Sequence, residues 1–180
     1  MPIVIGAKPE SSFADPIGLL TDCHRRIERF LGVLARLAVE AGGGPLTPEQ
    51  HAALETALRY FREAAPKHTA DEESSLFPRL RVHSEDAAEK LAALEADHQH
   101  ADQDHAEVDR LGREWLISGG LSASDAAQFS ALTAKLKSLY REHIALEEDV
   151  VFPLASRLLP AGDRHAIGQE MAARRQVKQA

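Results

Sequence analysis

HTADEESSLFP, residues 68–78, recurs as HIALEEDVVFP, residues 143–153. Both copies read H-x3-E-E-x3-F-P. Residues four apart lie on the same face of an α-helix, roughly 6 Å apart along its axis. On a helix, the histidine and the first glutamate of each copy can therefore bind the same metal ion. Two such pairs in one chain predict a site that holds more than one ion.

Two further histidines extend this pattern. His24 is followed four residues later by Glu28, and His98 is followed four residues later by Asp102. These two histidines precede the histidines of the repeated motifs by 44 and 45 residues. We interpret the chain as two related halves, each with one H-x3-acid helix followed by another.

Composition limits the class of protein. A chain of 180 residues with 44% hydrophobic residues is long enough for one globular domain. Aromatic residues make up only 5%, while alanine and leucine are abundant, which favours helix over sheet. The net charge of −7 gives no electrostatic basis for nucleic-acid binding.

Cysteine content and hydropathy indicate the cellular compartment in which the protein is expected. Cys23 is the single cysteine, so an internal disulfide is excluded, and a lone thiol fits a reducing compartment. The chain contains no apolar run of membrane-spanning length, and its N-terminus lacks the pattern of a secretory signal. We therefore expect a cytoplasmic protein with no membrane partner.

Capping residues and helix breakers divide the chain into long helices. Asp15-Pro16, Thr47-Pro48 and Ser122 or Ser124 predict helix starts, and glycine-rich stretches at 42–44 and 119–120 predict helix ends. Pro66 predicts a kink. The prediction is all-α: an N-terminal arm over 1–14, an up-down-up-down four-helix bundle over 15–158, and a short C-terminal helix, capped by Asp163, with a basic tail over 159–180. The four bundle helices are expected at about 15–41, 47–82, 84–118 and 122–158.

Counting from the turns places the four histidines at one level. His24 and His68 lie at similar distances from the first turn. His68 and His98 lie at similar distances from the second turn, and His98 and His143 from the third. In an antiparallel bundle, all four histidines therefore lie at about the same height along the bundle axis. Thirteen of the sixteen residues at −7, −4, +3 and +7 from these histidines are apolar. The histidines therefore point into the core.

A buried layer of four histidines and several acids favours a metal centre over a metal-free core. Without a cation, the carboxylates would crowd in a low-dielectric interior. The acids lie on both sides of the histidine layer, so Glu72 and Glu147 are expected to bridge two ions, which usually lie about 3.5–4 Å apart. Imidazole and carboxylate ligands suit iron, manganese or zinc better than calcium or magnesium.

These residues and the F-P ending resemble the hemerythrin-like, or HHE cation-binding, family, over about residues 15–158. The resemblance implies a four-helix bundle with a non-haem di-iron centre. Zinc or manganese are the expected substitutes for the two iron ions. Carried over by position, the ligands are His24, His68, Glu72, His98, His143 and Glu147, and Asp102 is a further candidate.

The sequence departs from the oxygen-carrying members of that family. They have H-x3-H on the third helix, where this chain has Asp102 after His98. They also have an aspartate five residues after the last histidine, where this chain has Glu147 at four and Glu148 at five. A carboxylate-rich site stabilises higher iron oxidation states, which favours redox or sensing chemistry over reversible oxygen carriage.

Other residues near the motifs have structural roles as alternatives to a role in the site. Glu73 and Glu148 are expected on solvated faces, Glu28 in surface ion pairs or behind a ligand, and His105 behind the site, in a channel or in the core. Tyr60 and Tyr140 are either hydrogen-bond donors to a metal-bound species or core residues. Cys23 is expected to pack in the core, Phe77 and Phe152 to pack outside the site, and four histidines to lie on the surface: His51, His83, His100 and His165.

Three functions follow from this pattern. The first is a di-iron protein that binds or reacts with oxygen, nitric oxide or peroxide, with oxidoreductase activity left open. The second is a non-catalytic protein for metal storage, delivery or sensing that signals through an unknown partner, for which the basic segment 174–178 is a weak candidate surface. The third is a metal-free interaction bundle.

Overall fold

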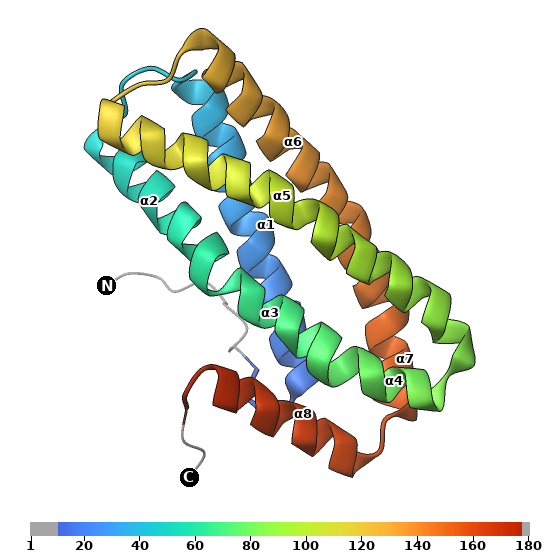
Figure 1. The fold of residues 1–180 in the computed structure, drawn as a ribbon. Coiled ribbons are helices and arrows are strands. Elements are labelled where there is room, and N and C mark those ends of the chain that lie inside the picture. Colours follow the sequence, from blue (N-terminus) through green and yellow to red (C-terminus); the bar gives the residue numbers. More distant parts are fainter. Residues whose placement is uncertain (1–10, 178–180) are drawn as a thin grey trace, which may run out of the picture.

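The computed structural model describes residues 11–177, which form an all-helical bundle without strands in that range (Figure 1). Residues 1–10 of the expected N-terminal arm lie outside the described residues. The helices are α1 (Pro16–Glu40), α2 (Pro48–Glu63), α3 (Ala65–Asp71), α4 (Phe77–His83), α5 (Ala88–Ser118), α6 (Ala123–Leu146), α7 (Phe152–Leu158) and α8 (Ala161–Arg174). Two π-helical turns, Glu72–Leu76 and Glu147–Val151, connect α3 to α4 and α6 to α7. A 3₁₀ turn, Glu85–Ala87, precedes α5.

The helix starts follow the capping signals. Asp15 accepts a hydrogen bond from the Gly18 amide, and Thr47 and Gln50 form a reciprocal capping box. Ser122, rather than Ser124, caps α6. The expected cap for the last helix is wrong, because α8 begins after Pro160 without a side-chain cap, and Asp163 pairs with His83 instead.

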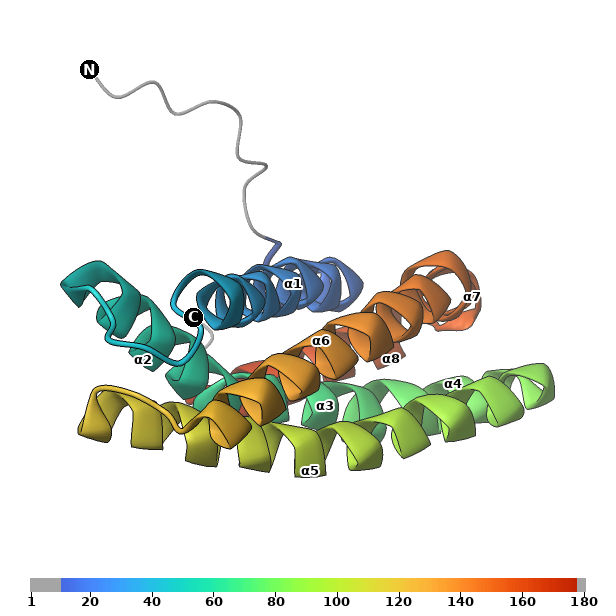
Figure 2. The same ribbon diagram turned by 90° about the horizontal axis from the view of Figure 1, so that it is seen from above.

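Packing arranges these helices as four rods around a common core. α1 packs against α2 and α6, and α5 packs against the same two helices (Figures 1 and 2). Pro66 lies at the start of α3, and the rod formed by α2, α3 and α4 is interrupted there, as expected. At one end of the bundle the Leu121 amide donates to the Gly43 carbonyl, and the Trp115 indole donates to the Gly44 carbonyl, at 2.8 Å each. These bonds tie the α1–α2 turn to the α5–α6 turn.

The core consists of two apolar clusters with the histidine layer between them. One cluster lies toward the tied turns and includes Leu34, Leu58 and Trp115. The other lies toward α8 and includes Leu20, Leu80 and Met171. No helix within the described residues is long and apolar enough to cross a membrane.

The two π turns follow from the Phe-Pro end of each motif. Pro78 has no N–H, and in a regular α-helix its ring would clash with the carbonyl four residues earlier. The chain avoids this clash by widening the turn, so that the amide of Phe77 donates to the carbonyl of Glu72, five residues back, and Phe152 does the same to Glu147. Residues after each turn are therefore rotated from the positions that a straight helix predicts. Val150, expected inside, is 36% exposed.

α8 covers one side of the bundle and is held by a buried carboxylate. Asp71 is fully buried at the end of α3, and it accepts hydrogen bonds from Arg174 at 2.7 Å and from Arg175 at 2.6 Å. Arg174 also donates to Ser75 at 2.7 Å. The two arginines of the basic segment are thus used within the fold and are not a free partner surface; Lys178 lies outside the described residues.

Candidate metal centre

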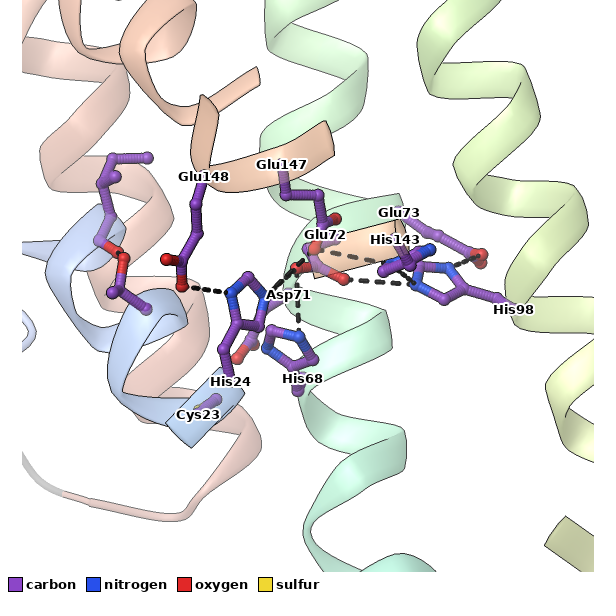
Figure 3. A network of polar contacts seen from close by, with 12 residues as sticks. Cys23, His24, His68, Asp71, Glu72, Glu73, His98, His143, Glu147 and Glu148 are labelled. Carbon is purple, nitrogen blue, oxygen red and sulfur yellow. Dashed lines mark hydrogen bonds and ion pairs between the residues drawn. The ribbon is translucent and has the colours of Figure 1, made fainter. Parts of the chain in front are cut away.

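Six buried side chains from four rods converge between the two apolar clusters (Figure 3). The four histidines are 1–6% exposed, and both glutamates are fully buried. Each motif histidine lies one turn before its glutamate, and each glutamate is the first residue of a π turn. The residues are His24 on α1, His68 on α3, His98 on α5, His143 on α6, and Glu72 and Glu147 on the two π turns.

The six residues form two overlapping groups of potential ligands. His24 and His68 belong to the first group, His98 and His143 belong to the second, and Glu72 and Glu147 belong to both. Within each group the ligand atoms all lie within 4.8 Å of one another. Two ions held this way would share both carboxylates.

The first group has the following geometry. Nε2 of His24 lies 3.0 Å from Oε2 of Glu147 and 3.8 Å from Oε1 of Glu72. Nε2 of His68 lies 3.1 Å from Oε1 of Glu72. Both imidazoles thus direct the same nitrogen toward the shared carboxylates.

The second group is arranged in the same way. Nε2 of His98 lies 3.4 Å from Oε2 of Glu72, and Nε2 of His143 lies 3.4 Å from Oε2 of Glu147. The two Nε2 atoms are 3.1 Å apart. Two nitrogens at this separation can hydrogen-bond to each other only if one carries a proton, whereas both can bind one cation as neutral imidazoles.

The shared carboxylates fit a cation better than they fit the protein alone. Within residues 11–177, none of the four buried oxygens of Glu72 and Glu147 has a hydrogen-bond partner, and neither does Nε2 of His24. An unpaired buried carboxylate is costly, and a divalent ion offsets its charge. These imidazole and carboxylate groups therefore fit a bound metal cation.

The pKa values of the histidines and of Glu72 also indicate strong interactions between the imidazoles and the carboxylates. Burial alone opposes protonation of His24, but the carboxylates of Glu147 and Glu72 outweigh it and raise its pKa to about 10. For His98, the same opposing effect of burial is outweighed by Glu72, and the pKa rises to about 9. Burial would raise the pKa of Glu72, yet the imidazoles hold it well below its usual range. In the metal-free chain the raised pKa values mean that His24 and His98 carry protons at neutral pH, and metal binding must displace those protons.

Three further acids lie behind the imidazoles. Nδ1 of His24 hydrogen-bonds to Glu148 at 2.8 Å, and Nδ1 of His98 hydrogen-bonds to Glu73 at 2.8 Å. Nδ1 of His143 lies 3.3 Å from Asp97. Such outer carboxylates orient a ligating histidine and raise its basicity.

The second glutamates reach solvent, as expected, but that expectation missed their contacts with the ligand histidines. Glu73 and Glu148 are about one-third exposed, but their carboxylates reach histidines on neighbouring rods. The exact repetition of the E-E pair in both motifs was a signal that both glutamates have a role. Asp97 was missed altogether, because it shares no helical periodicity with the motifs.

The phenylalanines of the motifs were also misplaced by the straight-helix expectation. Phe152 stacks on His24, with ring centroids 5.2 Å apart and an angle of 12° between the rings. Phe77 lies parallel to His98 at 6.5 Å. The π turns rotate both rings inward, so they wall the site on the side of α8.

The structure does not bring every candidate to the cluster. Asp102 is exposed and belongs to neither group, and Glu28 is exposed on α1. His51, His83, His100 and His165 are exposed, as expected. Tyr60 donates to the carbonyl oxygen of Cys23 at 3.4 Å.

His105 and Tyr140 form a separate pair beside the site. Nε2 of His105 lies 3.1 Å from the Tyr140 hydroxyl, and Phe61 stacks on the imidazole at 4.6 Å. Burial lowers the pKa of His105 to about 4, so this histidine is neutral at physiological pH. Burial raises the pKa of Tyr140 above its ordinary value. The Tyr140 ring meets the His143 ring edge-on at 6.0 Å.

Comparison with known proteins agrees with this geometry. The family model for the hemerythrin HHE cation binding domain matches residues 15–155. A curated relative from Haemophilus influenzae, described as an uncharacterized protein, is 30% identical over 169 residues, which cover 94% of this chain and 95% of the relative. The fold, the buried ligand groups and this match lead to one conclusion: the chain belongs to the hemerythrin HHE cation-binding domain family.

Proposed function

We propose that this protein holds two iron ions and uses them to bind or react with a small oxygen species: oxygen, nitric oxide or peroxide. The observation that carries the proposal is the sharing of Glu72 and Glu147 by both ligand groups, with all four carboxylate oxygens buried and without a hydrogen-bond partner among the described residues. His24 and His68 would hold one ion, and His98 and His143 the other. Asp102 is left out of the proposed ligand set because it is exposed.

The donor count favours a metal with open coordination positions. Two imidazole nitrogens and one oxygen from each shared carboxylate supply four protein donors per ion. Zinc commonly takes four ligands, so these donors alone would satisfy it. Non-haem iron and manganese commonly take six ligands, which leaves positions for a small molecule. When bound, iron would supply redox chemistry, and buried residues would hold it beside the rings of Phe77 and Phe152.

We also infer the setting of this centre. The rods follow an up-down-up-down order, supported by the neighbour contacts and by the pairing of the α1–α2 and α5–α6 turns. The net charge of −7 argues against a nucleic-acid partner. The lone cysteine supports a cytoplasmic location.

Anaerobic iron loading tests the proposal. The protein should bind two iron ions per chain, and exposure to air or nitric oxide should produce new optical absorption bands. Glu147→Gln should lose both ions, because Glu147 belongs to both groups. Its neighbour gives a matched control: Glu148→Gln should keep both ions with weaker binding, because Glu148 lies behind His24. Less than one ion per chain, or no spectral response, would contradict the proposal.

A sensor that signals through a partner is the second candidate. The observation in its favour is that Asp71, which holds α8, immediately precedes the shared ligand Glu72. A change at the metal site therefore has a short route to an outer helix. Hydrogen exchange in α8 with and without metal tests this candidate, and equal exchange in the two states would argue against it.

A further inference from the structure

A pocket of about 250 Å³ lies between α2 and α5, beside the histidine layer. Its lining includes Pro66, two residues before the ligand His68, and Asp102, four residues after the ligand His98. Along both rods, these lining residues lie on the side of the histidines that faces the tied turns. The pocket therefore adjoins one ligand helix of each group, α3 of the first and α5 of the second.

The opposite side of the histidine layer is covered by packed side chains. Phe77 and Phe152 wall the site toward α8, and they are 0% and 3% exposed. Beyond them lies the apolar cluster that includes Leu20 and Leu80. A molecule that approaches the metals from α8 would have to displace this packing, whereas a pocket already exists on the side of the tied turns.

The size and the walls of the pocket suit a small apolar molecule. Sites for drug-sized ligands measure roughly 300–1,000 Å³, so this pocket is smaller than most of them. Its walls include Leu58 and Val108, which are 2% and 1% exposed, and the ring of Phe61. Oxygen and nitric oxide are small and uncharged, and they lose little free energy when they leave water for such walls.

The charged groups of the lining do not make the pocket a site for ions. Asp102 is exposed, and Arg62 and Asp109 pair with each other at 2.6 Å. His105 also lines the pocket and is neutral at physiological pH, as described above. An ion that moved inward would lose its hydration among apolar side chains, which is costly, so the lining favours an uncharged molecule.

The His105–Tyr140 pair connects the pocket to the ligands. Nε2 of His105 lies 3.1 Å from the hydroxyl of Tyr140, which is 8% exposed. The Tyr140 ring in turn meets the ring of the ligand His143 edge-on at 6.0 Å. The series of contacts from the pocket to a ligand imidazole therefore runs through two side chains.

We propose that this pocket is the entry site through which oxygen or nitric oxide reaches the metal centre, and that the His105–Tyr140 pair forms its boundary with the ligand His143. The inference rests on the proposed function and adds the route by which the small molecule arrives. A route changes neither the free nor the bound state. Filling the pocket should therefore slow association and dissociation by the same factor and leave the equilibrium affinity unchanged.

Stopped-flow measurement of nitric oxide binding to the iron-loaded protein tests this route. Ala106 is exposed and lines the pocket, so Ala106→Phe adds a ring there, and Ala106→Ser is a control of nearly wild-type size. Ala106→Phe should slow association by about tenfold, since association rates among variants of one complex vary over about one to three decades. Ala134→Phe is the matched control at a second pocket, of about 500 Å³ between α1 and α6, and should bind at the wild-type rate.

Oxygen-induced NMR relaxation tests the pocket in the metal-free chain. Dissolved oxygen is paramagnetic, so it speeds the relaxation of methyl protons near the positions that it visits. Val108 and Leu34 are 1% and 0% exposed, and of these two only Val108 lines the pocket. Oxygen should therefore speed relaxation more at the Val108 methyls than at the Leu34 methyls, and Ala106→Phe should remove most of this difference.

Several results would overturn the inference. They are equal association rates in Ala106→Phe and Ala106→Ser, equal slowing in Ala134→Phe, or equal oxygen-induced relaxation at Val108 and Leu34. A lower equilibrium affinity in Ala106→Phe would also overturn it, because the substitution would then act on the metal centre itself. If the iron-loaded wild type responds to neither air nor nitric oxide, the proposed function fails and this inference fails with it.

Discussion

Replacing Glu72 by glutamine should remove most of the stability that metal adds to this protein. Glu72 belongs to both ligand groups and is fully buried, and neither of its oxygens has a hydrogen-bond partner among the described residues. A neutral amide cannot offset the charge of two cations, and its nitrogen cannot serve as the second bridging atom. His68→Ala, in contrast, removes a ligand from the first group only.

The sharing of ligands sets the expected magnitudes. An ion that binds only the folded state adds about 2.7 kcal/mol to the free energy of unfolding when its free concentration is about 100 times Kd. Two independent ions therefore add about 5 kcal/mol. For a chain of this length, 1 kcal/mol corresponds to roughly 2–4 °C in Tm, so a chelator should lower the Tm of the wild type by about 10–20 °C. The decrease should be about half as large for His68→Ala and close to zero for Glu72→Gln.

Thermal unfolding followed by far-UV circular dichroism, with zinc and then with excess chelator, measures these differences. Each variant is compared with itself, so changes in metal-free stability cancel. Glu55→Gln makes the same chemical change at an exposed position of α2 and should behave as wild type. The reasoning is refuted if the chelator leaves the wild-type Tm unchanged, or if Glu72→Gln responds to it as strongly as the wild type does.

Other predictions concern the surroundings of the centre. Asp71→Asn should lower the free energy of unfolding by about 3 kcal/mol, because it leaves two partly buried arginines without their carboxylate, and hydrogen exchange should rise first in α8. The lowered pKa of His105 means that its neutral form stabilises the fold above pH 6.5 and that this stability is lost as pH falls toward 4. Over this pH range, urea unfolding should show that the wild type loses up to about 3 kcal/mol more free energy of unfolding than His105→Phe does. Equal dependence of the free energy of unfolding on pH in the two proteins would contradict this assignment. Gly168→Ala should lower Tm because the added methyl collides with the backbone before α1, whereas Gly162→Ala on the same helix meets nothing within 4 Å and should not.

Much of the site could be predicted from periodicity alone. A regular helix determines which residues share a face, so apolar neighbours at helical spacing placed all four histidines inside. Equal distances from the turns placed them at one level, and the structure brings them together within two overlapping groups. The two first glutamates followed from the same argument, since each lies one turn from its histidine.

The errors arose where the helix is not regular or where contacts cross between rods. A straight-helix count turned Phe77 and Phe152 outward, because nothing in that count anticipates a π turn. Glu73 and Glu148 reach solvent as expected, but a count along one helix could not show that their carboxylates contact histidines on other rods. Asp102 has the spacing of a ligand, yet its helix face is turned to solvent at that position.

The sequence by itself therefore determined the helical class, the inward histidine layer and the pairing of each motif histidine with its first glutamate, because these depend on local geometry within one helix. Only the tertiary structure decided which acids lie behind the imidazoles of His24, His98 and His143, and how Asp71 holds α8. Those contacts join residues far apart in the chain. Their partners depend on how each rod is rotated and docked, which the π turns and the packing of neighbouring helices set together.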